Sequence, residues 1–118
     1  MAHKQWVLLL GRFQVLEPHE GHRSLVRALL NQGKNVCIGL READGGIENP
    51  YGYEERRNGF IKAFYEEILA ERLCVIELPD IIEIAYGRTP GWAITEIDLP
   101  EDLKKISATE IRKNEKLS

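Results

Sequence analysis

The stretch Gly11–His22, GRFQVLEPHEGH, stands between an apolar run and a helical pattern. Trp6–Leu10 precedes it and reads WVLLL, which is typical of a strand that a parallel sheet buries on both faces. Gly33 is well suited to end the helix that follows. Four apolar residues of that helix have the spacing of one face: Leu25, Val26, Leu29 and Leu30. The sequence therefore predicts a strand, a glycine turn and a helix that begins near two histidines.

The tetrapeptide His19-Glu20-Gly21-His22 is the strongest candidate site in this stretch. Histidines three residues apart on a first helical turn point the same way, and a helix start offers free N–H groups and the positive end of the dipole. Gly21 leaves the backbone open to close approach by a ligand. These features favour a phosphate site. Two other interpretations stay open: a metal site completed by Glu17 or Glu20, and a plain helix start without a ligand.

The rest of the chain alternates strands and helices. Four further strands are predicted, at Asn35–Leu40, Leu73–Leu78, Ile81–Tyr86 (a strand or sheet edge) and Trp92–Leu99. Two further helices are predicted at Glu54–Ala70 and from Ser107 onward, with a long loop at Arg41–Tyr53. This order predicts a single domain over residues 1–118, a three-layer α/β fold with a mainly parallel, five-stranded sheet.

Arginines follow three of four predicted strands, at the edge where ligands bind in such sheets. The dipeptides at the strand ends are Gly11-Arg12, Arg41-Glu42, Pro79-Asp80 and Gly87-Arg88. This edge is therefore predicted to be basic and to bind an anion, although the whole chain has a net charge of −3. Arg88 is equally open to interpretation as a surface turn residue, and Arg56 as a solvated residue of a helix start.

The composition limits the class of protein. The net charge of −3 argues against a general nucleic-acid binder. Met1–Gln5 is followed by an apolar run of only strand length, which predicts neither a signal peptide nor a membrane span, so a cytoplasmic protein is expected. Cys37 and Cys74 lie within apolar runs and are expected to be buried free thiols in neighbouring strands, rather than a disulfide or a metal pair.

A second motif, ISATEIR, stands at Ile106–Arg112. Ser107 and Glu110 have the spacing of a capping box, which alone predicts only a helix start. Thr109 and Arg112 add a hydroxyl and a guanidinium fork to the same turn. The turn is therefore either an ordinary helix start or a cradle for the outer phosphates of a nucleotide.

Taken together, the two motifs resemble the signatures of the HxGH nucleotidyltransferases, the cytidylyltransferase-like superfamily. The first is GRFQ with HEGH after a first strand, and the second is ISATEIR before a last helix. GRFQ and the segment Asn49–Arg57 look most like those of the nicotinamide-mononucleotide adenylyltransferases. The resemblance covers most of the chain and implies a Rossmann-like fold. Three features depart from it: a longer loop at Val15–Pro18, a length nearer that of the small cytidylyltransferases, and Arg41 where those enzymes carry a lysine.

The resemblance implies direct transfer of a nucleotidyl group from a nucleoside triphosphate to a small phosphorylated acceptor, with release of pyrophosphate and no covalent enzyme intermediate. Transfer of AMP from ATP is favoured, with nicotinamide mononucleotide as a candidate acceptor. The alternatives are transfer of CMP to a polyol or sugar phosphate, and a non-catalytic nucleotide-binding module. Mg²⁺ is expected to arrive with the triphosphate rather than on protein ligands. A homo-oligomer that binds neither nucleic acid nor membrane is also expected.

The resemblance also assigns roles to residues. His19, His22 and Arg112 are expected to be catalytic, because they stabilise charge that develops on the triphosphate. The acceptor phosphate is expected at Arg41 and Arg56. Nucleotide binding is expected from seven residues: Gly11, Arg12, Phe13, Gly21, Arg88, Ser107 and Thr109.

Overall fold

The computed structural model describes residues 4–42, 50–88 and 91–97 of the chain. Ser107, Thr109 and Arg112 lie outside the described residues, as does the helix expected from Ser107 onward.

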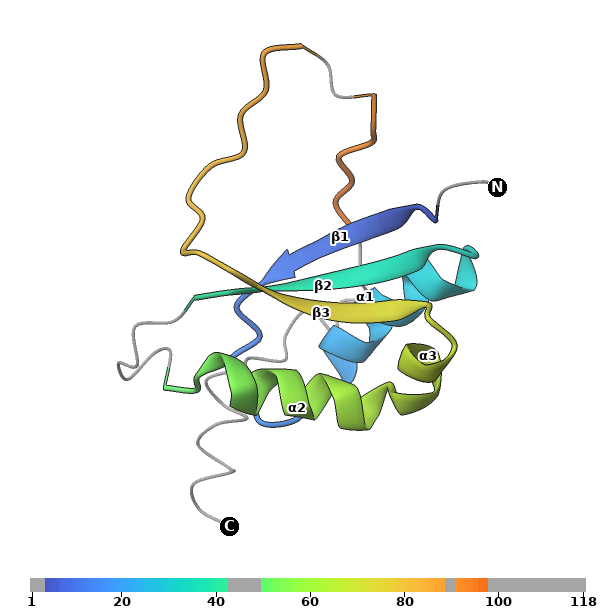
Figure 1. Ribbon diagram of the computed structural model, residues 1–118, viewed down its shortest axis with the longest axis vertical. Coiled ribbons are helices and arrows are strands. Elements are labelled where there is room, and N and C mark those ends of the chain that lie inside the picture. Colours follow the sequence, from blue (N-terminus) through green and yellow to red (C-terminus); the bar gives the residue numbers. More distant parts are fainter. Residues whose placement is uncertain (1–3, 43–49, 89–90, 98–118) are drawn as a thin grey trace.

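A three-stranded parallel sheet forms the centre of the described fold (Figure 1). Its strands are β1 (Trp6–Gly11), β2 (Asn35–Arg41) and β3 (Leu73–Leu78), in the order β1-β2-β3. Helix α1 (Glu20–Asn31) connects β1 to β2, and helices α2 (Tyr53–Ala63) and α3 (Tyr65–Leu69) precede β3. The predictions of an α/β fold and of a parallel sheet are confirmed, and each of these strands lies within one residue of its predicted bounds.

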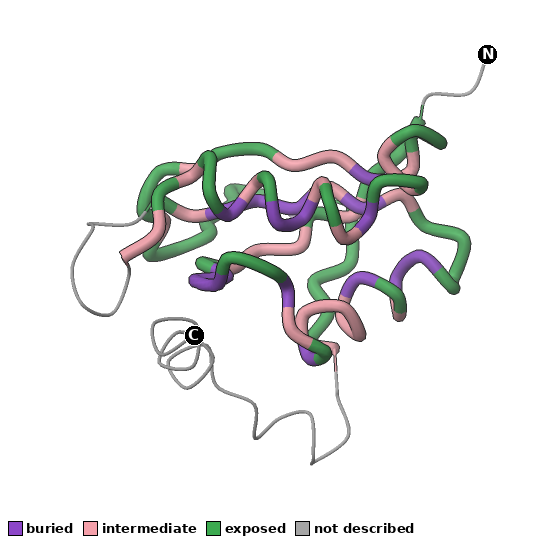
Figure 2. Tube along the Cα trace, turned by 90° about the horizontal axis from the view of Figure 1, so that it is seen from below, coloured by how far each residue is buried: buried purple, intermediate pink, exposed green. Residues whose placement is uncertain are grey.

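The helices cover one face of this sheet. Val36, Ile38 and Leu40 of β2 are fully buried, whereas the intervening Cys37 is only half-buried. Successive side chains of a strand point to opposite faces, so the buried set marks the covered face. Figure 2 shows the buried positions gathered along β2 and along the helices that face it. The helices and the turn between α2 and α3 contribute five side chains to this core: Val26, Leu29, Leu30, Phe60 and Phe64.

The opposite face has no covering layer among the described residues. Trp6, Leu8 and Ile76 are exposed there, beside the half-buried Cys37 and Cys74. We call these five residues the open sheet face. Cys37 and Cys74 are register partners on neighbouring strands and are free thiols, as predicted. They are half-buried rather than buried, because no second layer among the described residues covers them. Partial burial and the adjacent thiol raise the pKa of Cys37 to about 12.

The predicted fourth and fifth strands are not found in the described residues. Residues 81–86 and 92–97 form no strand, and residues 98–99 lie outside the described part, so the described sheet has three strands rather than five. Alternating apolar residues such as Ile82 and Ile84 meet only the local requirement of a strand. A strand also needs a neighbour to bond its N–H and C=O groups, and sequence alternation does not supply one.

The helix predicted at Glu54–Ala70 is divided at Phe64, where a backbone φ of −124° separates α2 from α3. The Phe64 side chain is fully buried, and its N–H still bonds the carbonyl of Phe60. The single predicted helix is therefore divided into two. Its first part packs in the core, whereas Tyr65 and Leu69 are exposed after the turn.

Candidate functional site

The carboxyl ends of the three strands bring two arginines to one carboxylate. Arg12 follows β1, Arg41 ends β2 and Asp80 follows β3, and parallel pairing places these ends side by side. The Oδ1 atom of Asp80 lies 3.4 Å from Nη2 of Arg12 and 3.1 Å from Nη2 of Arg41. One carboxylate is thus shared by two guanidinium groups at this edge. The Nε of Arg41 is also buried without a hydrogen-bond partner in the described part of the chain.

Arg56 lies beneath this pair and holds the strand ends together. Its side chain is 1% exposed. Nη1 donates to the carbonyl of Arg12 at 2.6 Å and to the carbonyl of Arg41 at 2.8 Å, while Nε donates to the carbonyl of Gly52 at 3.2 Å. Burial lowers the pKa of Arg56. The structure thus buries this predicted acceptor contact behind the strand ends, with its donors turned toward the backbone.

Gln14 joins the same turn to the segment before α2. Its Nε2 donates to the carbonyl of Tyr51 at 3.1 Å, and its Oε1 accepts from the Tyr51 N–H at 2.9 Å. The side chain is 3% exposed. A buried amide that bonds both backbone groups of one residue fixes that residue in place, because these groups then need no other partner. The role of Gln14 was missed from the sequence, although a glutamine amid apolar residues is a signal for such a bond.

His19 and His22 form a stacked pair at the start of α1. His19 is the N-cap residue, and its Nδ1 accepts the backbone N–H of His22 at 3.3 Å. The ring centroids are 3.6 Å apart with an interplanar angle of 18°. Because Nδ1 of His19 acts as an acceptor, its proton lies on Nε2, which leaves one N–H donor for a ligand.

Both histidines are biased toward the neutral form. Burial and the neighbouring His19 ring lower the pKa of His22 to about 3, and partial burial lowers the pKa of His19. Nδ1 of His22 is buried with no hydrogen-bond partner among the residues described. A phosphate brought to the helix start would oppose this bias, since an adjacent anion favours imidazolium.

Phe13 links the histidines to the end of β1. Its ring meets that of His22 edge-on, with centroids 4.9 Å apart. Its backbone φ is +49°, in the left-handed region that non-glycine residues rarely adopt. Gly11 permits this turn, because a Cβ at that position would lie 2.7 Å from the Phe13 ring. Gly11 and Phe13 therefore shape the turn that carries the strand into the histidine pair.

The loop Val15–Pro18 is packed against α2. Val15 and Pro18 are buried, and Gly59 of α2 comes so close that a Cβ there would overlap the carbonyl oxygen of Leu16. An exposed ion pair of 3.3 Å between Lys62 and Glu17 borders the contact. Gly59 was missed from the sequence, although a glycine inside a helical pattern often signals close backbone packing.

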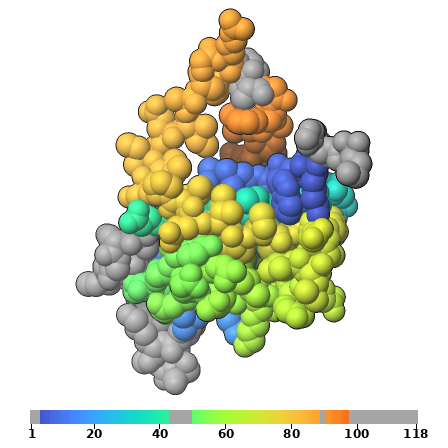
Figure 3. All heavy atoms as spheres, in the orientation of Figure 1, coloured from blue at the N-terminus to red at the C-terminus, as the bar shows by residue number. Residues whose placement is uncertain are grey.

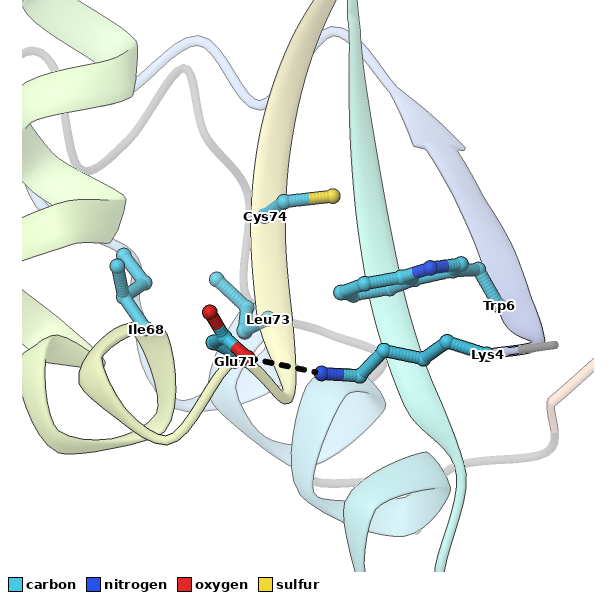
Figure 4. Close-up of a pocket in the computed structure, with 6 residues that line it drawn as sticks. All are labelled: Lys4, Trp6, Ile68, Glu71, Leu73 and Cys74. Atoms are coloured by element: carbon cyan, nitrogen blue, oxygen red, sulfur yellow. Dashed lines mark ion pairs between the residues drawn. The ribbon is translucent and has the colours of Figure 1, made fainter. Parts of the chain in front are cut away.

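Gly21 and Arg88 are the remaining predicted site residues in the described part of the chain. Gly21 is buried in the first turn of α1, and Arg88 is exposed in the segment after β3. Two hollows lie at the amino ends of the strands, away from the histidines. One of about 460 Å³ lies beside Trp6 and Cys74 (Figure 4), and one of about 720 Å³ lies beside Gly33 and Trp92.

Neither a metal cluster nor a membrane-spanning helix is found among the described residues. No group of three or more His, Cys, Asp or Glu residues is arranged to hold a metal ion in residues 4–42, 50–88 and 91–97. In the same ranges, none of the helices combines the length and apolar character that crossing a bilayer requires.

Comparisons with known proteins point to one enzyme name. The chain is 36% identical over 76 residues to the nicotinamide-nucleotide adenylyltransferase of Thermococcus onnurineus, a match that covers 63% of this chain and 40% of that protein. The proteins of the same name from Thermococcus kodakarensis and Pyrococcus horikoshii are 35% and 34% identical, with the same coverage. The chain thus spans about two-fifths of the length of these relatives. No protein-family model and no solved structure matches it.

Proposed function

We propose that this chain is an adenylyltransferase that transfers AMP from ATP to nicotinamide mononucleotide, with release of pyrophosphate. The observation that carries the proposal is the stacked pair of His19 and His22 at a helix start, joined through Phe13 to a strand end beside two arginines. The similarity to relatives named for this reaction supports the choice of adenylyl over cytidylyl transfer.

The reaction is a direct displacement. A phosphate oxygen of the acceptor forms a bond to the α-phosphorus of ATP, the bond from that phosphorus to the bridging oxygen breaks, and pyrophosphate leaves with the electron pair. Negative charge grows on the bridging and non-bridging oxygens as this occurs. His19 Nε2–H, the free N–H groups of α1 and its dipole would stabilise that charge, since donors fixed in advance need no reorganisation.

The basic strand ends are suited to the phosphate of the acceptor. Arg41 is our first choice as its contact, because its Nε lacks a hydrogen-bond partner in the described residues and its Nη2 is shared with only one carboxylate. Arg12 is the second. Arg56 would act by holding the carbonyls of both, which keeps these two backbones in register.

Mg²⁺ would enter as part of the MgATP substrate, where it neutralises charge on the phosphates. The proposed outer-phosphate contacts are Ser107, Thr109 and Arg112, with Arg88 as a further nucleotide contact; the first three lie outside the described residues.

A pyrophosphate-release assay tests the proposal. The purified chain is incubated with MgATP or MgCTP, and with nicotinamide mononucleotide or glycerol 3-phosphate. We expect release only from ATP with nicotinamide mononucleotide. Turnover of CTP with the polyol phosphate would reject the adenylyl assignment.

A non-catalytic nucleotide-binding module is the second candidate, because the loop Val15–Pro18 beside the histidines departs from the pattern of the adenylyltransferases that the chain resembles. Isothermal titration of MgATP separates it from the first. Binding of ATP without pyrophosphate release for any acceptor would support the module.

A further inference from the structure

Two thiols lie side by side on the open sheet face. Cys37 of β2 and Cys74 of β3 are register partners, so they stand opposite each other on neighbouring parallel strands. Val36 and Leu73, the residues before them, are buried on the helix side, and alternation along a strand therefore points both thiols to the other face. Both thiols are free and half-buried. The two strands thus present a pair of thiols together.

A small molecule has access to this pair past the described residues. In Figure 3, atoms of β1 and β3 lie at the surface of the molecule, and the chain after β3 stands out from them. Figure 4 shows the Cys74 side chain at the hollow of about 460 Å³, where it points away from Ile68 and toward the side of Trp6. An ion pair of 3.7 Å between Lys4 and Glu71 lines the same hollow. Cys74 is therefore the thiol that a solute in this hollow would meet first.

The spacing of the strands suits a bond between the two sulfurs. Neighbouring strands lie about 4.7–4.9 Å apart, and the Cα atoms of a disulfide are usually about 4.4–6.8 Å apart. Register partners can therefore be joined with little movement of the backbone. Burial and a hydrogen bond with the Cys74 thiol raise the pKa of Cys37 to about 12. Because only a thiolate attacks a disulfide, Cys37 is suited to react second, after Cys74.

We propose that Cys37 and Cys74 are a reversible redox site, at which a small disulfide such as oxidised glutathione converts the two thiols into one disulfide bond. The structure shows the reduced form of this site. The bond would lie on an exposed face, and exposed disulfides are more easily reduced than buried structural ones. In a reducing compartment such a bond forms transiently. The proposal does not rest on the proposed function.

The exchange has two steps. The Cys74 thiolate attacks one sulfur of the small disulfide, the S–S bond of that molecule breaks, and the first small thiolate leaves and takes up the proton that Cys74 released. Cys37 then gives its proton to water and attacks Sγ of Cys74. The mixed disulfide breaks, and the second small thiolate leaves and takes up a proton. Two protein thiols are thus oxidised while one small disulfide is reduced to two thiols.

Intact-mass measurement tests the proposal on the full, folded chain after incubation with excess oxidised glutathione. We expect a loss of about 2 Da, the mass of two hydrogens, and no uptake of iodoacetamide when the chain is afterwards denatured. Peptide mapping should recover Cys37 joined to Cys74, and excess reduced glutathione should restore both thiols. The proposal is overturned if the chain keeps both thiols, carries only glutathione adducts, or is joined to a second chain.

Two variants test the order of attack and the register. Cys37→Ser lacks the second thiol, so it should stop at the mixed disulfide and gain the mass of one glutathione; absence of this adduct overturns the proposal. Cys74→Ser/Ile76→Cys is the matched control, because Ile76 is on the same face and is 39% exposed. Its thiol lies about 7 Å further along β3, beyond disulfide reach of Cys37, so it should not join that residue.

Circular dichroism checks that both variants are folded, and the wild-type measurement needs neither of them. A folded control variant that forms an internal disulfide as readily as the wild type also overturns the proposal, because the register of the two strands would then not select the pair.

Discussion

The Arg56 guanidinium donates a 2.6 Å hydrogen bond to the carbonyl oxygen of Arg12, forty-four residues earlier in the chain. The same nitrogen reaches the carbonyl of Arg41 at 2.8 Å. One buried cation thus joins the end of β1, the end of β2 and the start of α2. The strand ends that we assign to substrate phosphates are joined by this contact.

Replacement of Arg56 by Met should lower the free energy of unfolding by about 2–4 kcal/mol, because the buried carbonyls lose their donor. Urea denaturation measures the change. Arg57→Met is the control, since the neighbouring position on α2 is more exposed, and its effect should stay within about 0.5 kcal/mol. Equal effects of the two substitutions would contradict the structural role of Arg56.

Gly59→Ala should also destabilise the chain, by about 1–3 kcal/mol. The added Cβ would overlap the carbonyl oxygen of Leu16, and the loop beside the histidines would have to move. Gly87→Ala makes the same change where nothing lies within 4 Å, so it should be nearly neutral. Thermal unfolding of both variants checks the pair. A neutral Gly59→Ala would show that the loop is not packed on α2.

The stability of the chain should fall as the pH is lowered through the range in which histidine titrates. The pKa of His22 is about 3 in the folded chain and near 6.5 when unfolded, so between these values the unfolded chain binds one more proton. Folding is then weakened by up to about 1.4 kcal/mol for each pH unit below the unfolded pKa. The contribution of His22 is fully present above that pKa.

Urea denaturation at about pH 7.5 and about pH 5.5, above the range in which most carboxylates titrate, isolates this effect. His22→Gln should show a shallower loss than the wild type between the two. If the two proteins lose the same free energy, His22 does not carry the proton linkage.

Asp80→Asn should tighten the binding of pyrophosphate. The carboxylate occupies both Arg12 and Arg41, and its removal frees them for an anion. Exposed ion pairs contribute about 0.2–1 kcal/mol, so we expect an affinity gain of up to about fivefold. Glu66→Gln is the control, since it removes one negative charge from α3, near the amino end of β3. Titration calorimetry would count against a strand-end anion site if both variants bound pyrophosphate alike.

The three strands and the first helix could be predicted because their evidence is local. Trp6–Leu10 is apolar without interruption, and Gly33 ends α1 with a φ of +79°. The convergence of Arg12 and Arg41 was also predictable, since parallel strands end at the same edge. The bounds of β3 followed from Pro79, which cannot donate to a ladder.

The remaining features depend on distant partners that no local pattern reveals. Ile82 and Ile84 alternate as a strand does, but pairing needs a neighbour. Arg56 was expected to contact the acceptor phosphate or to be a solvated residue of a helix start; it is buried because backbone carbonyls from separate parts of the chain meet there. The pKa of His22 likewise follows from Phe13, Phe60 and His19 packed around its ring.

One measurement tests the proposed function most directly. Chromatography follows the formation of the dinucleotide from MgATP and nicotinamide mononucleotide by the wild type, His19→Gln and His22→Gln. We predict product and pyrophosphate in equal amounts from the wild type. The two variants should lose about 100- to 1,000-fold in kcat, because we propose that both histidines stabilise the charge that develops on the triphosphate. Absence of the dinucleotide with folded wild-type chain, or variants as fast as the wild type, would contradict adenylyl transfer at the histidine pair.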